Sequence, residues 1–174
     1  NIKLNLMTTK VFKENLKAYL KGYRLIINQG GQASGKTYAI LQLLASIATL
    51  EKRKNHIVVV SYALPHLKSG AMRVFDTILE KMGYDLEKVK NKAENRYYLN
   101  NSMIEFFGIE GKEARAHSLR PDIIYLNEAN MRISWEVFRQ FYSRVQRCMF
   151  IDFNPCRMFW INDYIYGKEK NYII

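Results

Sequence analysis

Four short apolar runs recur along the chain, and each one ends at polar or turn-forming residues. They cover Tyr23–Asn28, His56–Ser61, Asp122–Asn127 and Cys148–Phe153. Short continuous apolar runs that are rich in β-branched residues are typical of strands buried on both faces, as in the centre of a parallel sheet. We therefore expect these four segments to form the core strands of the protein.

Apolar residues at helical spacing fill the intervals between these runs. They predict an amphipathic helix over residues 8–21, a helix over Lys36–Leu50 that is apolar nearly all round, and a single helix over residues 65–82. Ser134 is a suitable N-cap for a further helix that ends near Val145. Strands that alternate with helices predict an α/β fold with a mainly parallel central sheet flanked by helices.

A β-hairpin interrupts this alternation. Arg96–Leu99 and Met103–Phe107 alternate on either side of an Asn-Asn pair that suits a tight turn. Neither a repeat nor a Pro- or Ser-rich linker divides the chain, so we expect one domain over residues 1–174. Because the sequence does not begin with Met and stops abruptly, we also expect it to be a piece of a longer protein.

Charge and composition narrow the class of partner. The chain has 27 Lys and Arg against 16 Asp and Glu, a net charge of +11, which favours a polyanionic partner with nucleic acid first. No apolar run is long enough to span a bilayer and no signal segment opens the chain, so we expect no membrane partner. The two cysteines and three histidines lack zinc-site spacing, which indicates a reduced intracellular protein.

The residues after the first apolar run match the phosphate-binding sequence G-x-x-x-x-G-K-[ST] between a predicted strand and a predicted helix. The glycines bring backbone N–H groups close to phosphates, and the helix N-terminus adds partial positive charge. Lys36 is expected to reach the β- and γ-phosphates of ATP, and the Thr37 hydroxyl is expected to ligate Mg²⁺. The matching residues are Gly30, Gly31, Gln32, Ala33, Ser34, Gly35, Lys36 and Thr37.

A polar pair, Asn127-Glu128, ends the third apolar run. In P-loop ATPases this element usually ends in Asp-Glu, where the Asp holds the metal shell and the Glu polarises the attacking water. Asn127 can still accept a hydrogen bond from a metal-bound water, but it brings no charge, so we expect somewhat weaker Mg²⁺ binding. Glu128 is expected to be the general base. Asp122 begins the same strand, and we expect it at the opposite edge of the sheet in a structural role.

Asn154 follows the fourth apolar run and precedes a proline. At a strand tip beside Glu128, its side chain could touch the γ-phosphate or the attacking water and report hydrolysis to the rest of the domain. The same residues also fit an ordinary strand-to-turn Asn-Pro, and spacing alone does not separate the two interpretations.

Four segments in order resemble motifs of the ATPase domain of phage terminase large subunits, the motors that pump DNA into viral capsids. They are GGQASGKT, RYYLNNSMIEFFG, YLNEAN and DFNPCRMFWI, and the resemblance covers roughly residues 23–165. Many families share the phosphate loop, whereas Asn-Glu-Ala-Asn together with Phe-Asn-Pro and Trp160 is more specific. The resemblance implies a P-loop NTPase fold of the additional-strand, catalytic-glutamate (ASCE) type. The family also carries a C-terminal nuclease domain, which we expect to be absent from these residues.

The resemblance implies the same roles for the phosphate loop and for Glu128, and it places Asn154 at the end of a motif that couples hydrolysis to movement. The family also uses an arginine finger from a neighbouring subunit, shortly before the catalytic strand, where Arg115 and Arg120 are the candidates. The implied partners are double-stranded DNA bound without regard to sequence, the portal protein, the small terminase subunit and other copies in a homo-oligomeric ring. The implied location is the host cell cytoplasm.

Two residues depart from the family pattern. Many terminases carry Arg in the phosphate loop where this chain has Gln32, so that positive charge is missing or comes from elsewhere. The coupling motif more often begins with Ser or Thr where this chain has Asp152, so the sensing role of that position is not carried over.

Three other functions share parts of this pattern. A helicase-like nucleic-acid motor would use the same loop and Glu128, but it needs a second motor domain. A nucleotide or small-molecule kinase needs a phosphoacceptor site and a mobile lid, for which Lys112–Arg120 is the available segment. A nucleotide-binding assembly module without turnover is favoured by Asn127 in place of Asp, and turnover that Glu128→Gln abolishes would exclude it.

Overall fold

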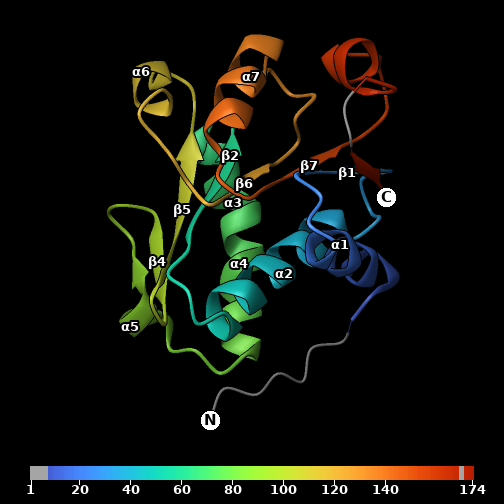
Figure 1. Cartoon of the computed structure of the whole chain (residues 1–174). Coiled ribbons are helices and arrows are strands. Elements are labelled where there is room, and N and C mark those ends of the chain that lie inside the picture. The colour runs from blue at the N-terminus through green and yellow to red at the C-terminus, as the bar shows by residue number, and fades with distance from the viewer. Residues whose placement is uncertain (1–7, 169–170) are drawn as a thin grey trace.

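The computed structural model describes residues 8–168 and 171–174, which fold around one eight-stranded sheet (Figure 1). The strand order is β3-β4-β5-β2-β6-β7-β1-β8. Strands β5, β2, β6, β7, β1 and β8 run parallel, and β3, β4 and β5 pair antiparallel at one edge. The predicted α/β class with a mainly parallel sheet is confirmed. The strands are β1 (Leu25–Gln29), β2 (His56–Ser61), β3 (Lys90–Asn91), β4 (Arg96–Leu99), β5 (Ser102–Gly108), β6 (Ile123–Leu126), β7 (Cys148–Phe153) and β8 (Tyr172–Ile173).

The predicted hairpin belongs to the core sheet. The four predicted core strands correspond to β1, β2, β6 and β7, and the hairpin corresponds to β4 and β5. The sequence did not predict that β5 also pairs in parallel with β2, from His56↔Met103 to Ser61↔Gly108. Because β5 is buried along most of its length, the hairpin extends the parallel core and is not a surface appendage.

Helices cover both faces of the sheet, as Figure 1 shows. One apolar cluster joins α1, α2, α3 and α4 to one face, and a second joins α6, α7 and η1 to the other. α2 is buried along nearly its whole length, as its all-round apolar pattern predicts. Among the described residues, no helix combines the length and apolarity needed to cross a membrane. The helices are α1 (Lys10–Leu20), α2 (Lys36–Leu50), α3 (Leu64–Ser69), α4 (Ala71–Lys81), α5 (Leu86–Val89), α6 (Glu113–Ala116), α7 (Trp135–Arg144) and the π-helix η1 (Ile161–Ile165).

The prediction of a single helix over residues 65–82 is wrong, because the structure contains two helices there. α3 ends at Ser69 and α4 begins at Ala71. Gly70 between them has φ −111° and ψ −95°, outside the helical region. A Cβ at this position would lie 3.1 Å from the His66 carbonyl oxygen, so the position is also crowded. Apolar spacing continues across the break and therefore does not reveal it.

The start of α3 packs directly on the end of β5. A Cβ on Gly108 would lie 2.5 Å from the Leu64 nitrogen and 2.9 Å from its Cα. These are backbone atoms, which cannot rotate away as the end of a flexible side chain can. The missing Cβ at Gly108 thus lets α3 lie against the carboxyl end of β5, and α3 carries His66 toward the strand tips.

We expect Gly108→Ala to lower the free energy of unfolding by about 1–3 kcal/mol, the usual cost of overpacking a close contact. Urea denaturation followed by circular dichroism measures the change. Gly31→Ala is the matched control, because a Cβ at Gly31 meets no atom within 4 Å. Equal stability of the two variants would show that α3 is not held closely against β5.

Candidate active site at the phosphate loop

Three neighbouring strands bring the sequence motifs together at their carboxyl ends. β7 lies between β1 and β6 and pairs in parallel with both. The phosphate loop follows β1, Glu128 follows the end of β6, and Asn154 follows β7. All three therefore meet at the carboxyl ends of parallel strands, where ligands bind in open α/β sheets. β7 is the additional strand that an ASCE-type fold implies.

The phosphate loop wraps around the amine of Lys36. The Lys36 Nζ donates hydrogen bonds to the carbonyl oxygens of Gly30 at 2.7 Å and Gly31 at 2.8 Å. It also donates to the Ser34 hydroxyl at 2.9 Å. Gly35, with φ +73°, adopts a left-handed conformation that glycine tolerates, and α2 starts at the next residue. These three acceptors hold the amine inside the loop.

Lys36 also links the loop to the residue that follows β7. The Asn154 Oδ1 lies 3.3 Å from the Lys36 Nζ, so the structure brings Asn154 to the phosphate loop. Burial lowers the pKa of Lys36, and the charges of Asp152 and Glu128 oppose that shift. The lysine is therefore within electrostatic reach of both carboxylates.

The carboxylate of Asp152 lies at the centre of the site and is only 2% exposed. Its Oδ2 accepts hydrogen bonds from the Thr37 hydroxyl at 3.1 Å and from the Tyr125 hydroxyl at 2.8 Å. The Asn127 amide nitrogen lies 3.4 and 3.5 Å from the two carboxylate oxygens, and it donates to the Tyr125 hydroxyl at 3.1 Å. Burial raises the pKa of Asp152, and the hydrogen bonds from the Glu128 backbone, Tyr125 and Thr37 oppose the shift.

Glu128 has an unusual backbone conformation, with φ +53°. Residues other than glycine rarely adopt it, and the Asp152 carboxylate supports it by accepting the Glu128 N–H at 2.5 Å. The Glu128 side chain contacts the Nε2 of His66 on α3. A cavity of about 230 Å³ lies beside this pair and is lined by Ser61, Tyr62, Ala63, His66, Glu128, Met131 and Arg132.

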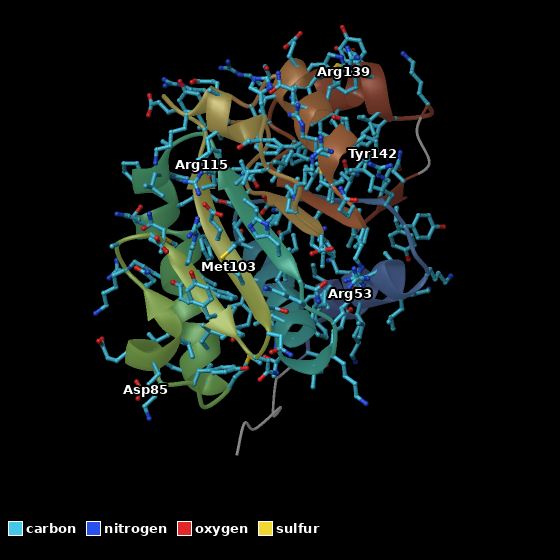
Figure 2. The ribbon with its side chains drawn as sticks, turned by 60° about the vertical axis from the view of Figure 1, so that its left-hand side comes forward. Arg53, Asp85, Met103, Arg115, Arg139 and Tyr142 are labelled. Carbon is cyan, nitrogen blue, oxygen red and sulfur yellow. The ribbon has the colours of Figure 1, made fainter. Side chains whose placement is uncertain are left out.

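The two candidates for an arginine finger differ in their surroundings. Arg115 on α6 contacts the buried Glu105 carboxylate, and its guanidinium lies 5.5 Å from the centroid of the Phe107 ring. Figure 2 shows Arg115 beside one end of the sheet, with Arg53 toward the other end. Arg120 is exposed, and none of the described residues holds it in a hydrogen bond or ion pair. The structure thus leaves Arg120 accessible and engages Arg115 within its own chain.

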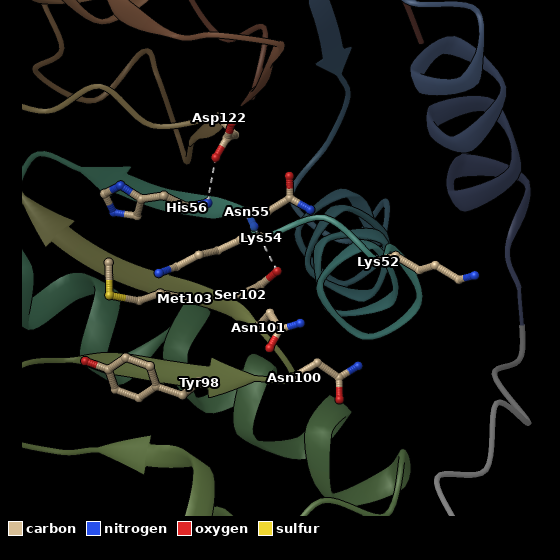
Figure 3. Close-up of a pocket in the computed structure, with 10 residues that line it drawn as sticks. All are labelled: Lys52, Lys54, Asn55, His56, Tyr98, Asn100, Asn101, Ser102, Met103 and Asp122. Atoms are coloured by element: carbon tan, nitrogen blue, oxygen red, sulfur yellow. Dashed lines mark hydrogen bonds between the residues drawn. The ribbon is translucent and has the colours of Figure 1, made fainter.

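Asp122 lies at the opposite end of the parallel strands, as the sequence predicts. Its carboxylate accepts the His56 N–H at 2.8 Å and pairs with Arg53 at 3.3 Å, and its carbonyl oxygen accepts the Arg147 N–H at 2.9 Å. These contacts join the beginnings of β2, β6 and β7, so Asp122 has a structural role. It also lines a pocket of about 850 Å³ together with Lys54 and others (Figure 3).

Sequence analysis did not identify Asp152 and His66 as residues of this site. For Asp152 a signal exists, because a carboxylate within the apolar run CMFIDF must be buried, and a buried charge requires partners. For His66 there is no such signal. It is a half-exposed histidine near the start of a helix, and only the close packing of α3 on β5 brings it to Glu128.

We expect Tyr125→Phe to lower the free energy of unfolding by about 1–3 kcal/mol, because it removes a hydrogen bond from a buried carboxylate. Thermal or urea denaturation measures the loss. Tyr164→Phe is the control, since Tyr164 is exposed and its hydroxyl lies outside this network. A Tyr125→Phe protein as stable as the wild type would mean that Asp152 does not depend on this hydroxyl.

Comparison with known proteins finds no match in sequence but several in structure. No model of a protein family matches the chain, and no curated protein matches it. Solved structures do match. The large terminase of a thermophilic bacteriophage superposes with a TM-score of 0.76 at 14% identity, covering 96% of this chain and 44% of the terminase. The HK97 bacteriophage large terminase gives 0.67 at 14% identity, covering 87% of this chain and 34% of that protein.

The large terminase of the same thermophilic bacteriophage in complex with ADP also matches, with a TM-score of 0.66 at 17% identity, over 83% of this chain and 37% of that protein. The chain thus spans less than half the length of each of these terminases. At these identities the likeness concerns the three-dimensional arrangement of the elements and not a shared activity. Over most of its length, the protein has the fold of phage large terminases.

Proposed function

We propose that the chain is a Mg²⁺-dependent ATPase that hydrolyses ATP to ADP and phosphate and thereby drives double-stranded DNA into a viral procapsid. The observation that carries the proposal is the meeting of Lys36, Thr37 and Glu128 where β1, β7 and β6 end. The fold shared with phage large terminases supports a packaging motor over other P-loop ATPases.

The phosphate loop binds the nucleotide in this proposal. Lys36 exchanges its contacts with the Gly30 and Gly31 carbonyls for oxygens of the β- and γ-phosphates. Backbone N–H groups at the start of α2 point toward the same phosphates and favour their negative charge. The large terminase of the thermophilic bacteriophage has been solved in complex with ADP and with ATP-gamma-S, which supports a nucleotide as the ligand of this fold.

The donors beside the loop suit Mg²⁺. A buried carboxylate oxygen of Asp152 lies 3.1 Å from the Thr37 hydroxyl, so hard oxygen donors meet at this point. Thr37 would hold the ion, whose charge offsets that of the phosphate oxygens. The described residues contain no group of three or more His, Cys, Asp or Glu side chains placed for a metal. Mg²⁺ tolerates this, because it keeps several waters and shares substrate phosphates.

Glu128 acts as the general base that orients the attacking water and takes its proton. The hydrogen bond from the Glu128 N–H to Asp152 fixes the backbone from which this side chain extends. The contact with His66 engages the Oε2 of Glu128, so Oε1 is the oxygen available to the water. Asn154 senses whether the γ-phosphate is present and passes that state to the segment after β7, a role that its distance of 3.3 Å from the lysine amine supports.

An arginine from a neighbouring copy completes the site. Both arginines are exposed, and Arg120 is the better candidate because Arg115 is held by Glu105. An arginine that stabilises the charge developing on the phosphoryl group contributes about 10³–10⁵ in rate. Gln32 brings no positive charge to the phosphate loop, so this role falls to another residue.

The net charge of +11 supports double-stranded DNA as a partner held through its phosphates without regard to sequence. Such binding suits a motor that must pass any sequence. As part of a packaging motor, the domain would work in a homo-oligomeric ring that docks on the portal protein and receives DNA from the small terminase subunit.

A nucleotide-binding assembly module without turnover is the second candidate. The contact between the Glu128 carboxylate and His66 favours it, because a base held in this way does not activate water with that oxygen. The uncharged Asn127 beside the loop points the same way. Measured turnover separates the two functions.

We expect the wild type to hydrolyse ATP at a rate per molecule that rises with protein concentration, because a neighbouring copy supplies the arginine. Glu128→Gln should lower the rate by about 10²–10⁴-fold, the usual contribution of a general base. Phosphate release measured over a concentration series tests both expectations. If wild type and Glu128→Gln are equally silent while both bind nucleotide, the assembly module replaces the ATPase.

A mixing experiment tests the arginine in trans. Arg120→Ala and Glu128→Gln subunits are each expected to be inactive, by about 10³-fold or more for the arginine. When mixed they should regain turnover, because the Glu128→Gln subunit donates Arg120 to a site with an intact base. Arg115→Ala is the control and should keep turnover by itself. Recovery with Arg115→Ala and not with Arg120→Ala would exchange the two assignments.

A further inference from the structure

Two residues with unexpected side chains meet at this site. Asn127 stands where P-loop ATPases usually have Asp, and Asp152 stands where the terminase coupling motif more often has Ser or Thr. β6 and β7 pair in parallel, and the Asn127 amide nitrogen lies 3.4 and 3.5 Å from the Asp152 carboxylate oxygens. The usual P-loop ATPase residues and the residues of this chain therefore each place one carboxylate at this point. It follows β6 in the usual case and lies on β7 here.

Burial makes a second carboxylate unfavourable here. Asn127 and Asp152 are 4% and 2% exposed. Two ionised carboxylates at such a distance repel, and one of them would take up a proton. An amide avoids the conflict, because its nitrogen donates to the carboxylate that an aspartate would repel. The asparagine is thus compatible with the buried carboxylate of Asp152, whereas an aspartate is not.

The position of Asp152 relative to the phosphate loop matches that of a metal-shell carboxylate. In P-loop NTPases the Mg²⁺ is held by the Ser or Thr of the loop and by an aspartate from a neighbouring strand. The Asp152 Oδ2 lies 3.1 Å from the Thr37 hydroxyl oxygen. Asn127 turns its amide nitrogen toward Asp152, because an ionised carboxylate can only accept hydrogen bonds. The part of Asn127 that faces Asp152 is therefore a hydrogen-bond donor and not a metal ligand.

We propose that Asp152, and not Asn127, supplies the negative charge that holds the water shell of Mg²⁺, and that Asn127 serves to hold this carboxylate. The inference rests on the proposed ATP-binding function. Asp152 also accepts the Glu128 N–H, so one positioning residue sets both the metal shell and the backbone of the general base. The carboxylate of Asp152 then compensates for the charge that Asn127 lacks.

The test measures the affinity for a fluorescent ADP analogue, once with Mg²⁺ and once in EDTA. Asp152→Asn keeps the shape and removes the charge. It should reduce the Mg²⁺-dependent gain in affinity by roughly 10- to 100-fold, the usual effect of losing a residue that supports a metal. Affinity in EDTA should not change, because the contacts of Lys36 remain. Asp163→Asn makes the same change at an exposed carboxylate on η1 and is the matched control.

The reciprocal variant Asn127→Asp/Asp152→Ser moves the carboxylate to the end of β6, where P-loop ATPases usually carry it, and is expected to recover the Mg²⁺-dependent gain. Thermal denaturation shows whether each variant is folded. A full Mg²⁺-dependent gain in Asp152→Asn would overturn the inference. So would an equal loss of affinity with Mg²⁺ and in EDTA, which marks a purely structural role. A wild type that binds no nucleotide under either condition would refute the proposed function itself.

Discussion

A single buried carboxylate determines how the residues at the carboxyl ends of β1, β6 and β7 are arranged. Asp152 is almost completely removed from water, where a charge without partners is strongly unfavourable. Its donors are the hydroxyls of Thr37 and Tyr125, the amide of Asn127 and the N–H of Glu128. They come from the helix after the phosphate loop, from β6 and from the residues that follow it. The hydrogen bonds that make the buried charge tolerable therefore also assemble the site.

The strand order makes this arrangement possible. β7 lies between the strand that leads into the phosphate loop and the strand that leads to Glu128, so a side chain on β7 can reach both. On the side of β6 away from β7, the absence of a Cβ at Gly108 lets α3 pack on β5. α3 thereby carries His66 to the Glu128 carboxylate. Glu128 thus receives a backbone contact from Asp152 and a side-chain contact from α3, and these hold a left-handed residue at the strand tip.

The sequence predicts the core strands, the buried helix and the phosphate loop because local patterns determine them. The apolar runs, the all-round apolar α2 and the phosphate loop all follow from residues close together in the chain. The break at Gly70 does not, since apolar spacing continues across it and only the non-helical backbone of Gly70 separates α3 from α4. The contact of Asp152 with Thr37 joins residues far apart in the sequence, and it depends on the order of strands in the sheet. The same holds for His66 and Glu128, which no local pattern connects.

The most direct measurement is the anomalous scattering of Mn²⁺, in place of Mg²⁺, in crystals grown with a non-hydrolysable ATP analogue. The central role of Asp152 predicts a Mn²⁺ peak next to the Thr37 hydroxyl, with the Asp152 carboxylate bonded to a metal-bound water and the Asn127 nitrogen still facing that carboxylate. A peak whose waters are bonded by the Asn127 oxygen, with Asp152 bonded only to Tyr125 and to the Glu128 backbone, would contradict it.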